Sequence, residues 1–495
     1  MGMILRAGGT RAFVCFGVAS LCSALLIVKA PAQAAAGQES ENAQTVAALF
    51  VSDIHFEPFW DPEKATQLAA APVPAWKAIL GSPASADREQ QFVALQQTCH
   101  ARGVDTSYTL LESSLRAMRA DAADAKFVIV SGDLIAHAFS CKFTTLFPKA
   151  APGDYRAFAE KTLYYVMSEL RGAFPGLPVY AALGNNDSDC GDYKLDAKSE
   201  FLGASGRTLT ADVPAAERKD ALQTFAAGGY YSVTLPAPMQ RTRLLVLNDL
   251  FMARQYETCG GKTDTAPAAE QIEWMKEQLD AARRKDEKVW VMSHIPPGVD
   301  PYSTAMKGKD VCKGNAPTMF LSSEALPEAM AGYGNVIRLA IFAHTHMDEL
   351  RLLEPAKKDA SQREVAVKLI ASISPVDGNN PSFTVALIDP ASATMKDYRV
   401  FAASNQTGMD TTWVEEYDFA QTYKVPAFSA VTLESLIAGF QADPKSQSSA
   451  SQSYIHSFGT GMGKRELSMI WPEYVCALEN DEADAFRACV CGAGQ

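Results

Sequence analysis

Histidine, aspartate and asparagine residues that could bind a metal ion follow directly after apolar segments at five places in the chain. The five segments read SDIH (52–55), SGDLIAH (131–137), LGNND (183–187), SHIPPG (293–298) and AHTH (343–346). Five of the seven histidines of the chain fall in these segments. Each short motif alone is a weak signal, but five of them in this order are hard to explain as packing.

The residue types in these segments match a site for divalent transition metals. Imidazole nitrogens and carboxylate oxygens suit zinc, iron(II) or manganese. Seven side chains supply such donors: Asp53, His55, Asp133, Asn185, His294, His344 and His346. This number exceeds what one ion uses and suits two ions about 4 Å apart that share a carboxylate. Such a pair clamps a phosphoryl oxygen and makes hydroxide available at neutral pH, so the sequence predicts phosphoester chemistry.

The segments that must position these donors alternate between strand-like and helix-like patterns. Residues 45–56, 125–137 and 179–187 read as buried strands with polar ends, and helix-like segments at 108–123 and 155–171 separate them. This alternation indicates an α/β protein with a largely parallel central sheet. In such sheets, functional residues gather at the carboxyl ends of the strands.

Two other regions have weaker patterns. Between Asp192 and Gly228 the sequence is charged and mixed, which favours an irregular surface segment. From about Glu434 onward the chain is predicted to be helical, with a break in the Ser/Gln-rich stretch at 446–454.

The charge of the chain excludes some classes of partner. Its formal net charge is −12 and its sequence pI is about 5.2. Nonspecific binding to a nucleic acid duplex or to an anionic membrane needs a basic face, so neither partner is expected.

The N-terminus has the features of a secretory signal. Arg6 and Arg11 precede an apolar run at 12–28, and Ala32-Gln33-Ala34 forms an A-x-A cleavage site. We expect cleavage after about Ala34, a secreted or periplasmic protein, and no stable membrane span after cleavage. An uncleaved anchor is the alternative, but the run is slightly short for a full span.

The cysteine count agrees with export. Outside the predicted signal, eight cysteines remain: Cys99, Cys141, Cys190, Cys259, Cys312, Cys476, Cys489 and Cys491. An even number in an exported chain predicts disulfides. The spacings leave the pairing open, although Cys476 with Cys489 or Cys491 would close a loop near the C-terminus.

The ordered motifs D-x-H, G-D, G-N-[HN]-[DE], H and H-T-H resemble those of the calcineurin-like metallophosphoesterases. The longer forms GDLIAH, SHIPPG and AHTHMDEL, with the later GNNPSF (378–383), resemble the acid-sphingomyelinase-like and endopolyphosphatase-like branch. The resemblance covers about residues 47–389. It implies an α/β fold in which a β-sandwich is flanked by helices in four αββα layers, with a helical C-terminal extension.

On this basis the chain divides into four parts. A signal peptide (1–34) and a linker (35–46) precede a catalytic domain (47–430), and a cysteine-containing helical extension (431–495) follows.

The resemblance also implies a ligand set and a mechanism. Asp53, His55 and His346 would hold one metal ion, Asn185, His294 and His344 would hold the other, and Asp133 would bridge them. Zinc is the first choice of metal, with manganese or iron as alternatives. A hydroxide that bridges the two ions would attack phosphorus in line.

The chain departs from the family pattern at two positions. Ala343 replaces a glycine, a change that should be tolerated, and Asn186 stands where many relatives carry a histidine. Asparagine cannot act as a general acid, but it can donate a hydrogen bond to a phosphoryl oxygen. We therefore assign proton donation to His137, whose alternative role is to orient Asp133. Asp187 reads as a turn residue that orients its neighbours.

The expected reaction is hydrolysis of phosphodiesters or phosphoanhydrides in a small-molecule or polymeric substrate. A sphingomyelin phosphodiesterase is one alternative, but Asp53 comes only 18 positions after Ala35, which leaves no room for the saposin-type domain of the animal enzymes. An inactive exported metal-binding protein is an alternative of another class. The candidate substrate contacts are Phe59, Asn379 and Asn380.

Overall fold

The computed structural model describes residues 45–151, 153–355, 363–461 and 465–492. The predicted signal peptide and nearly all of the linker lie outside these residues. Among the described residues, no helix is both long enough and apolar enough to cross a bilayer.

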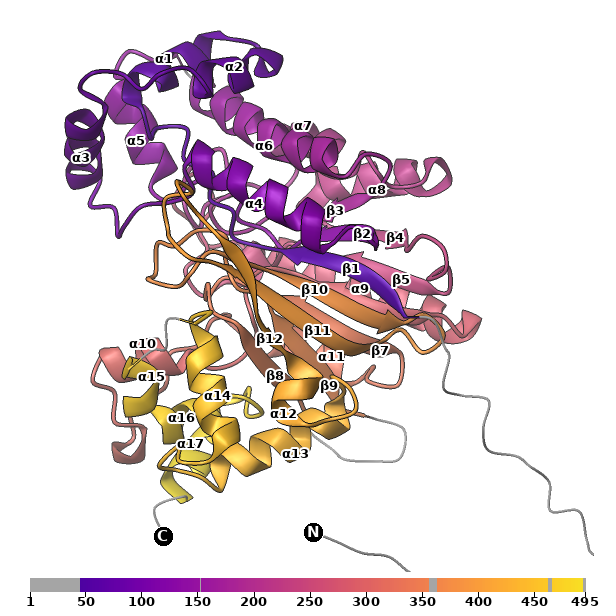
Figure 1. Ribbon diagram of the computed structural model, residues 1–495. Coiled ribbons are helices and arrows are strands. Elements are labelled where there is room, and N and C mark those ends of the chain that lie inside the picture. The colour runs from indigo at the N-terminus through magenta and orange to yellow at the C-terminus, as the bar shows by residue number, and fades with distance from the viewer. Residues whose placement is uncertain (1–44, 152, 356–362, 462–464, 493–495) are drawn as a thin grey trace, which may run out of the picture. The chain divides into compact units, whose positions relative to one another are not determined.

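Two six-stranded mixed sheets form the centre of the unit that begins at Gln44 (Figure 1). In spatial order the first contains β12 (Trp413–Asp418), β11 (Thr394–Ala403), β10 (Ser382–Asp389), β1 (Val46–Val51), β2 (Ala125–Val130) and β3 (Val179–Ala181). The second contains β4 (Tyr231–Thr234), β5 (Thr242–Val246), β6 (Lys288–Met292), β7 (Ile337–Phe342), β9 (Val365–Leu369) and β8 (Glu349–Leu353). The runs β1-β2-β3 and β5-β6-β7-β9 are parallel, and antiparallel strands complete each sheet.

The two sheets pack face to face. Trp290 of β6 in the second sheet lies 6.1 Å, between ring centroids, from both Phe50 of β1 and Phe127 of β2 in the first. The parallel strands are buried almost throughout, which explains their nearly continuous apolar sequences. The strand–helix alternation predicted one largely parallel sheet. That prediction is wrong in the number of sheets, because alternation along the chain does not reveal that β1–β3 and β5–β9 belong to two separate sheets.

Helices cover the outer faces of the sandwich. Along the first sheet lie α4 (Tyr108–Asp121) and α6 (Asp154–Ala173), and next to them α7 (Glu200–Leu209) and α8 (Ala215–Gly228) (Figure 1). On the second sheet, α9 (Ala266–Lys285) packs against β6 and α11 (Ala325–Ala331) against β8. These layers confirm the four-layer α/β prediction.

The region from Asp192 to Gly228 is more regular than its sequence predicts. It forms α7 and α8, which bury Phe201, Leu202 and Phe225. The apolar pattern of each helix is sparse because the two helices pack against each other and a few apolar residues suffice for that contact.

Shorter helices connect these layers. They are α1 (Pro62–Ala70), η1 (Val73–Ala75), α2 (Trp76–Leu80), α3 (Arg88–Thr98), α5 (Phe139–Leu146), η2 (Asp249–Met252), α10 (Pro301–Met306), η3 (Val311–Lys313) and α12 (Phe419–Tyr423).

The C-terminal part of the chain is helical and lies beside α10 and β8, in yellow in Figure 1. It contains α13 (Ala430–Gln441), α14 (Ser449–Phe458), α15 (Arg465–Met469), α16 (Trp471–Cys476) and α17 (Ala483–Gly492). The predicted break at 446–454 is shorter in the structure, because the Ser448 side chain accepts a hydrogen bond from the Ser451 N–H and caps α14.

The eight cysteines outside the predicted signal form four disulfides. The pairs are Cys99–Cys141, Cys190–Cys259, Cys312–Cys491 and Cys476–Cys489. The pair Cys312–Cys491 joins segments 179 residues apart and fixes α17 next to η3.

Candidate metal centre

The predicted metal ligands lie in the turns that follow five parallel strands. Asp53 and His55 follow β1, Asp133 follows β2, Asn185 follows β3, His294 follows β6, and His344 and His346 follow β7. Five of these residues have a left-handed backbone, with φ of 45° at Asp53, 44° at His55, 54° at Asp133, 73° at His344 and 65° at His346. Aspartate and histidine tolerate this conformation better than most residues, so they can end a strand in a sharp turn.

These turns bring the donor atoms within contact distance. The Nε2 atoms of His55 and His346 lie 3.2 Å apart. Asp133 Oδ2 lies 3.4 Å from His55 Nε2 and 3.2 Å from His294 Nε2. Asn185 Oδ1 lies 3.1 Å from His294 Nε2. Asp133 thus stands between two groups of donors, where a bridging carboxylate would have to be.

Backbone carbonyls orient two of the imidazoles. His55 Nδ1 donates to the Ile135 carbonyl at 2.9 Å, and His294 Nδ1 donates to the Ser131 carbonyl at 2.8 Å. With Nδ1 of each ring donating to a carbonyl, the Nε2 atoms of both rings face the centre, where they would bind a metal ion in place of a proton.

The donor set fits divalent metal ions. Asp53 Oδ1 is fully buried and has no hydrogen-bond donor, although His346 Nε2 is 3.5 Å away. A buried carboxylate oxygen without a partner is costly, and a bound cation would satisfy it. Burial raises the pKa of Asp53, but His346 and His294 outweigh that effect and lower it to about 2. Burial lowers the pKa of His294, but Asp133, Asp53 and Asp249 together reverse this and raise it to about 10. The centre therefore favours bound positive charge.

Further carboxylates hold the ligand-bearing turns in place. Asp187 accepts hydrogen bonds from the N–H groups of Leu134, Ile135 and Gly184, which ties the turn after β3 to the turn after β2. The expectation that Asp187 orients its neighbours agrees with these contacts.

Two more carboxylates act in the same way. Asp249 accepts from the Ile295 N–H beside His294, and Asp192 accepts from the Asn185 amide at 2.7 Å.

Asn186 lies against Asp133 instead of facing a substrate. Its side-chain amide donates to Asp133 Oδ2 and its backbone N–H to Asp133 Oδ1, both at 2.8 Å. The prediction that Asn186 faces the substrate phosphate is therefore corrected to a role in holding Asp133. The amide satisfies its donors on the nearest carboxylate, as a buried polar group must.

His137 lies at the edge of the centre. Its ring stacks on that of His55, with 3.9 Å between centroids. Asp105 accepts hydrogen bonds from the His137 backbone N–H at 2.8 Å and from its Nδ1 at 3.0 Å, and also from Ser374 Oγ at 2.8 Å. Arg102 donates to His137 Nε2 at 3.2 Å. His137 thus contacts Asp105 and not Asp133, so its alternative role of orienting Asp133 is not supported.

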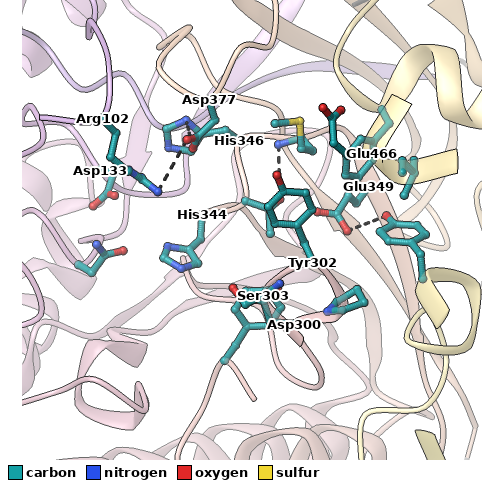
Figure 2. Close-up of a pocket in the computed structure, with 18 of the residues that line it drawn as sticks. Arg102, Asp133, Asp300, Tyr302, Ser303, His344, His346, Glu349, Asp377 and Glu466 are labelled. Atoms are coloured by element: carbon teal, nitrogen blue, oxygen red, sulfur yellow. Dashed lines mark hydrogen bonds and ion pairs between the residues drawn. The ribbon is translucent and has the colours of Figure 1, made fainter. Parts of the chain in front are cut away.

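A cavity of about 690 Å³ opens over these residues (Figure 2). One part of its wall contains Asp133, Asn185, His137, His344 and His346. The wall continues along α10 to the C-terminal helices, where Phe458, Leu467, Ile470 and Tyr474 line it. The cavity wall therefore joins the candidate metal ligands to an apolar part that the C-terminal helices supply.

The three predicted substrate contacts are not in this wall. Phe59 is fully buried and packs against Phe139 and Phe158, so it belongs to the core. The side-chain amide of Asn379 donates to the carbonyls of Ser374 and Asn380, and that of Asn380 donates to the Thr460 carbonyl. These asparagines hold a loop together, so the prediction that the three residues contact substrate is corrected.

Sequence reasoning missed several residues of the site, chiefly Arg102, Asp105, Asp249 and Asp377. Asp249 follows the apolar strand β5 at once and shares the pattern of the predicted ligands, so the sequence carried a signal for it. Arg102 and Asp105 lie in a loop without strand signals, where nothing marked them.

Comparison with known proteins agrees with this geometry. The family model described as calcineurin-like phosphoesterase matches residues 47–348, which include all seven predicted metal ligands. The human acid sphingomyelinase-like phosphodiesterase 3b is 25% identical over 410 residues, covering 79% of this chain and 81% of that protein. The rat cyclic GMP-AMP phosphodiesterase SMPDL3A is 26% identical over 343 residues, covering 67% and 70%.

A third relative and a solved structure extend the comparison. Sphingomyelinase phosphodiesterase D of Dictyostelium discoideum is 25% identical over 329 residues, covering 65% of this chain and 67% of that protein. A dimetal phosphatase from Danio rerio superposes with a TM-score of 0.38 at 12% identity, covering 75% of this chain and 98% of that one. The chain belongs to the calcineurin-like phosphoesterase family, in its acid-sphingomyelinase-like branch, and is a phosphoric ester hydrolase.

Proposed function

We propose that the chain is an exported, dinuclear metal-dependent enzyme that hydrolyses phosphodiesters or phosphoanhydrides. The observation that carries this proposal is the convergence of the seven donors around Asp133, which lies 3.4 Å from His55 Nε2 and 3.2 Å from His294 Nε2. Asp53, His55 and His346 would hold one ion, and Asn185, His294 and His344 the other. Zinc is the first choice, with manganese or iron as alternatives.

Two divalent ions at this centre would polarise a phosphoryl oxygen and supply hydroxide at neutral pH. The protein contributes orientation. The Ile135 and Ser131 carbonyls fix two imidazoles, and Asn186 and Asp187 fix Asp133 and its turn. His137 directs Nε2 toward the cavity because its Nδ1 donates a hydrogen bond to the Asp105 carboxylate. We assign to this atom the delivery of a proton to the leaving oxygen.

Export is supported by two independent features. The N-terminal sequence has the pattern of a cleaved secretory signal, and the four disulfides are of the kind that persists in oxidising compartments.

The cavity and the relatives support a choice of substrate classes to test. Two relatives are named as a cyclic GMP-AMP phosphodiesterase and a sphingomyelinase phosphodiesterase, so nucleotide-like and lipid-like diesters are the candidates to compare. The apolar residues Phe458, Leu467 and Ile470 favour a substrate whose second group is large and partly apolar.

The test is to purify the chain, measure its metal content by emission spectroscopy and assay it with added zinc or manganese. Substrates are bis-p-nitrophenyl phosphate, p-nitrophenyl phosphate, ATP, polyphosphate and sphingomyelin. We expect about two metal ions per chain and turnover of at least one diester or anhydride. The Asp133→Asn variant should lose both, while Asp220→Asn, on the exposed surface of α8, should lose neither. Bound metal without turnover on any substrate would support the inactive alternative, and less than one ion per chain would refute the dinuclear centre.

A further inference from the structure

Arg102 projects into the cavity from a loop that is tied to the proposed proton donor. The Cys99–Cys141 disulfide joins this loop to α5, which begins two residues after His137. Cys99 is three residues before Arg102 and Cys141 is four residues after His137. This bridge keeps the Arg102 loop beside His137 on the wall of the cavity.

The guanidinium of Arg102 remains accessible. Its side chain is 62% exposed, it donates to His137 Nε2 at 3.2 Å, and its Nη1 lies 3.7 Å from Asp377 Oδ1. Two contacts of this kind, one of them beyond normal hydrogen-bond length, leave other N–H donors of the planar fork available for a ligand.

The other arginine in the cavity wall is differently placed. The side chain of Arg351 is only 4% exposed, and its guanidinium donates to the carbonyls of Pro297 and Val299 and lies 3.6 Å from Glu349. These contacts occupy Arg351 in the fold, so Arg102 is the better placed of the two to bind an anion.

Besides the two arginines and the histidines, the charged side chains of the wall are carboxylates, which repel anions. Figure 2 shows Arg102 beside Asp377 and His346, and the acidic residues Asp300, Glu349 and Glu466 elsewhere around the cavity. A substrate with a second negative group beyond the reacting phosphate would meet carboxylates at most of these positions. At Arg102 it would meet a cation.

We propose that Arg102 binds a second phosphate, adjacent to the phosphate that reacts, and so selects substrates that contain a diphosphate. The order of contacts supports this position. The predicted ligand His55 stacks on His137, and His137 accepts from Arg102, so the guanidinium lies one residue further from the metal centre than the proton donor. A planar guanidinium can bind phosphate oxygens through two parallel hydrogen bonds. A phosphate there would also draw the Arg102 donor away from His137 Nε2, the atom that must carry the proton.

This inference rests on the proposed function, and its test separates the two. Bis-p-nitrophenyl phosphate, which has one phosphate, reports whether the enzyme turns over. Thymidine 5′-diphosphate and thymidine 5′-phosphate are then compared as competitive inhibitors of that reaction at saturating manganese, in the wild type and in Arg102→Ala, Arg102→Lys and Arg284→Ala. Arg284 is exposed at the end of α9 and is not in the cavity wall, so its variant is the matched control.

In the wild type and in Arg284→Ala, the diphosphate should bind at least tenfold more tightly than the monophosphate. Arg102→Ala should weaken the diphosphate by roughly 10- to 100-fold, as expected for loss of charge-assisted hydrogen bonds, and bring the ratio close to one. Arg102→Lys should fall between the two, because lysine keeps the charge without the planar fork.

An unchanged diphosphate-to-monophosphate ratio in Arg102→Ala would overturn the inference while leaving the proposed function intact. If kcat on bis-p-nitrophenyl phosphate also fell in that variant, Arg102 would instead be a positioning residue for His137. Absence of turnover in the wild type would instead refute the proposed function.

Discussion

Replacing Asp105 by asparagine tests whether His137 acts as the proton donor and whether Asp105 positions it. Asp105 is buried and accepts three hydrogen bonds, two from His137 and one from Ser374. Burial raises the pKa of this carboxyl, but His137, His55 and Lys142 together outweigh burial and hold the pKa well below its usual range. Asp105 is therefore an ionised acceptor, and the Asp105→Asn variant keeps its size while removing its charge.

The expected magnitude follows from these contacts. Asparagine retains one acceptor oxygen. Its NH₂ group takes the place of the other carboxylate oxygen and faces a donor that formerly bonded to that oxygen. The variant loses at least one charge-assisted hydrogen bond and leaves a buried donor unpaired, so the free energy of unfolding should fall by about 2–4 kcal/mol. Loss of a residue that orients an imidazole should lower kcat by roughly 10- to 100-fold.

The assay is a double-mutant cycle with His137→Ala. We measure kcat for the wild type, the two single variants and the double variant, on bis-p-nitrophenyl phosphate and on a thymidine dinucleotide. The alkoxide that leaves from the dinucleotide needs a proton more than nitrophenolate does. Both single variants should therefore lose more activity on the dinucleotide than on bis-p-nitrophenyl phosphate. The double variant should be no slower than His137→Ala alone, because residues that act as a unit are not additive.

Two results would refute this reasoning. If the losses from the two single variants multiply in the double variant, Asp105 acts by a route other than His137. If His137→Ala costs the same factor on both substrates, His137 is not the proton donor.

Three further predictions address the centre, the core and the surface. A Cβ at position 184 would lie 2.0 Å from Asp133 Oδ1, so Gly184→Ala should lose bound metal, measured by emission spectroscopy, and activity, measured by turnover. The control Gly203→Ala should keep both, because its Cβ would meet no atom within 4 Å. Phe59→Ala should lower the free energy of unfolding by about 3–5 kcal/mol in denaturant titrations, and an unchanged stability with a raised KM would restore its predicted substrate contact. Burial raises the pKa of Glu416 from 4.5 to about 7, so ionisation of this side chain destabilises the fold increasingly as pH rises through this range. The Glu416→Gln variant should melt roughly 1–3 °C above the wild type at pH 8 and at the same temperature as the wild type at pH 4.5. Equal gains at the two pH values would contradict this.

The sequence indicated the candidate metal ligands more clearly than it indicated the residues around them. The seven donors follow apolar strands at once, so a local pattern marks them, and the structure brings them together. The four-layer fold followed from the resemblance that these motifs carry, whereas the strand–helix pattern alone predicted a single sheet.

The remaining parts of the site depend on contacts between distant segments. Asp105 reaches His137 across 32 residues of chain, and Asp187 reaches Leu134 across 53. The side-chain amides of Asn379 and Asn380 donate hydrogen bonds to backbone carbonyls. The sequence alone cannot distinguish this role from substrate binding. The disulfide pairing likewise depends on the path of the chain, as the separation of 179 residues between Cys312 and Cys491 illustrates.

The left-handed backbone at five of the predicted ligands sets thermal stability against activity. At Asp53, His55, Asp133, His344 and His346 an L side chain adopts a conformation that costs up to about 1–2 kcal/mol per residue relative to glycine. The sum is comparable to the whole net stability of a typical domain. A directed-evolution screen for heat resistance alone would therefore favour glycine at these positions. The most thermostable variants from such a screen would be those that had lost the candidate metal centre. Engineering of this chain for stability should hold these five positions constant and seek its gains elsewhere in the fold.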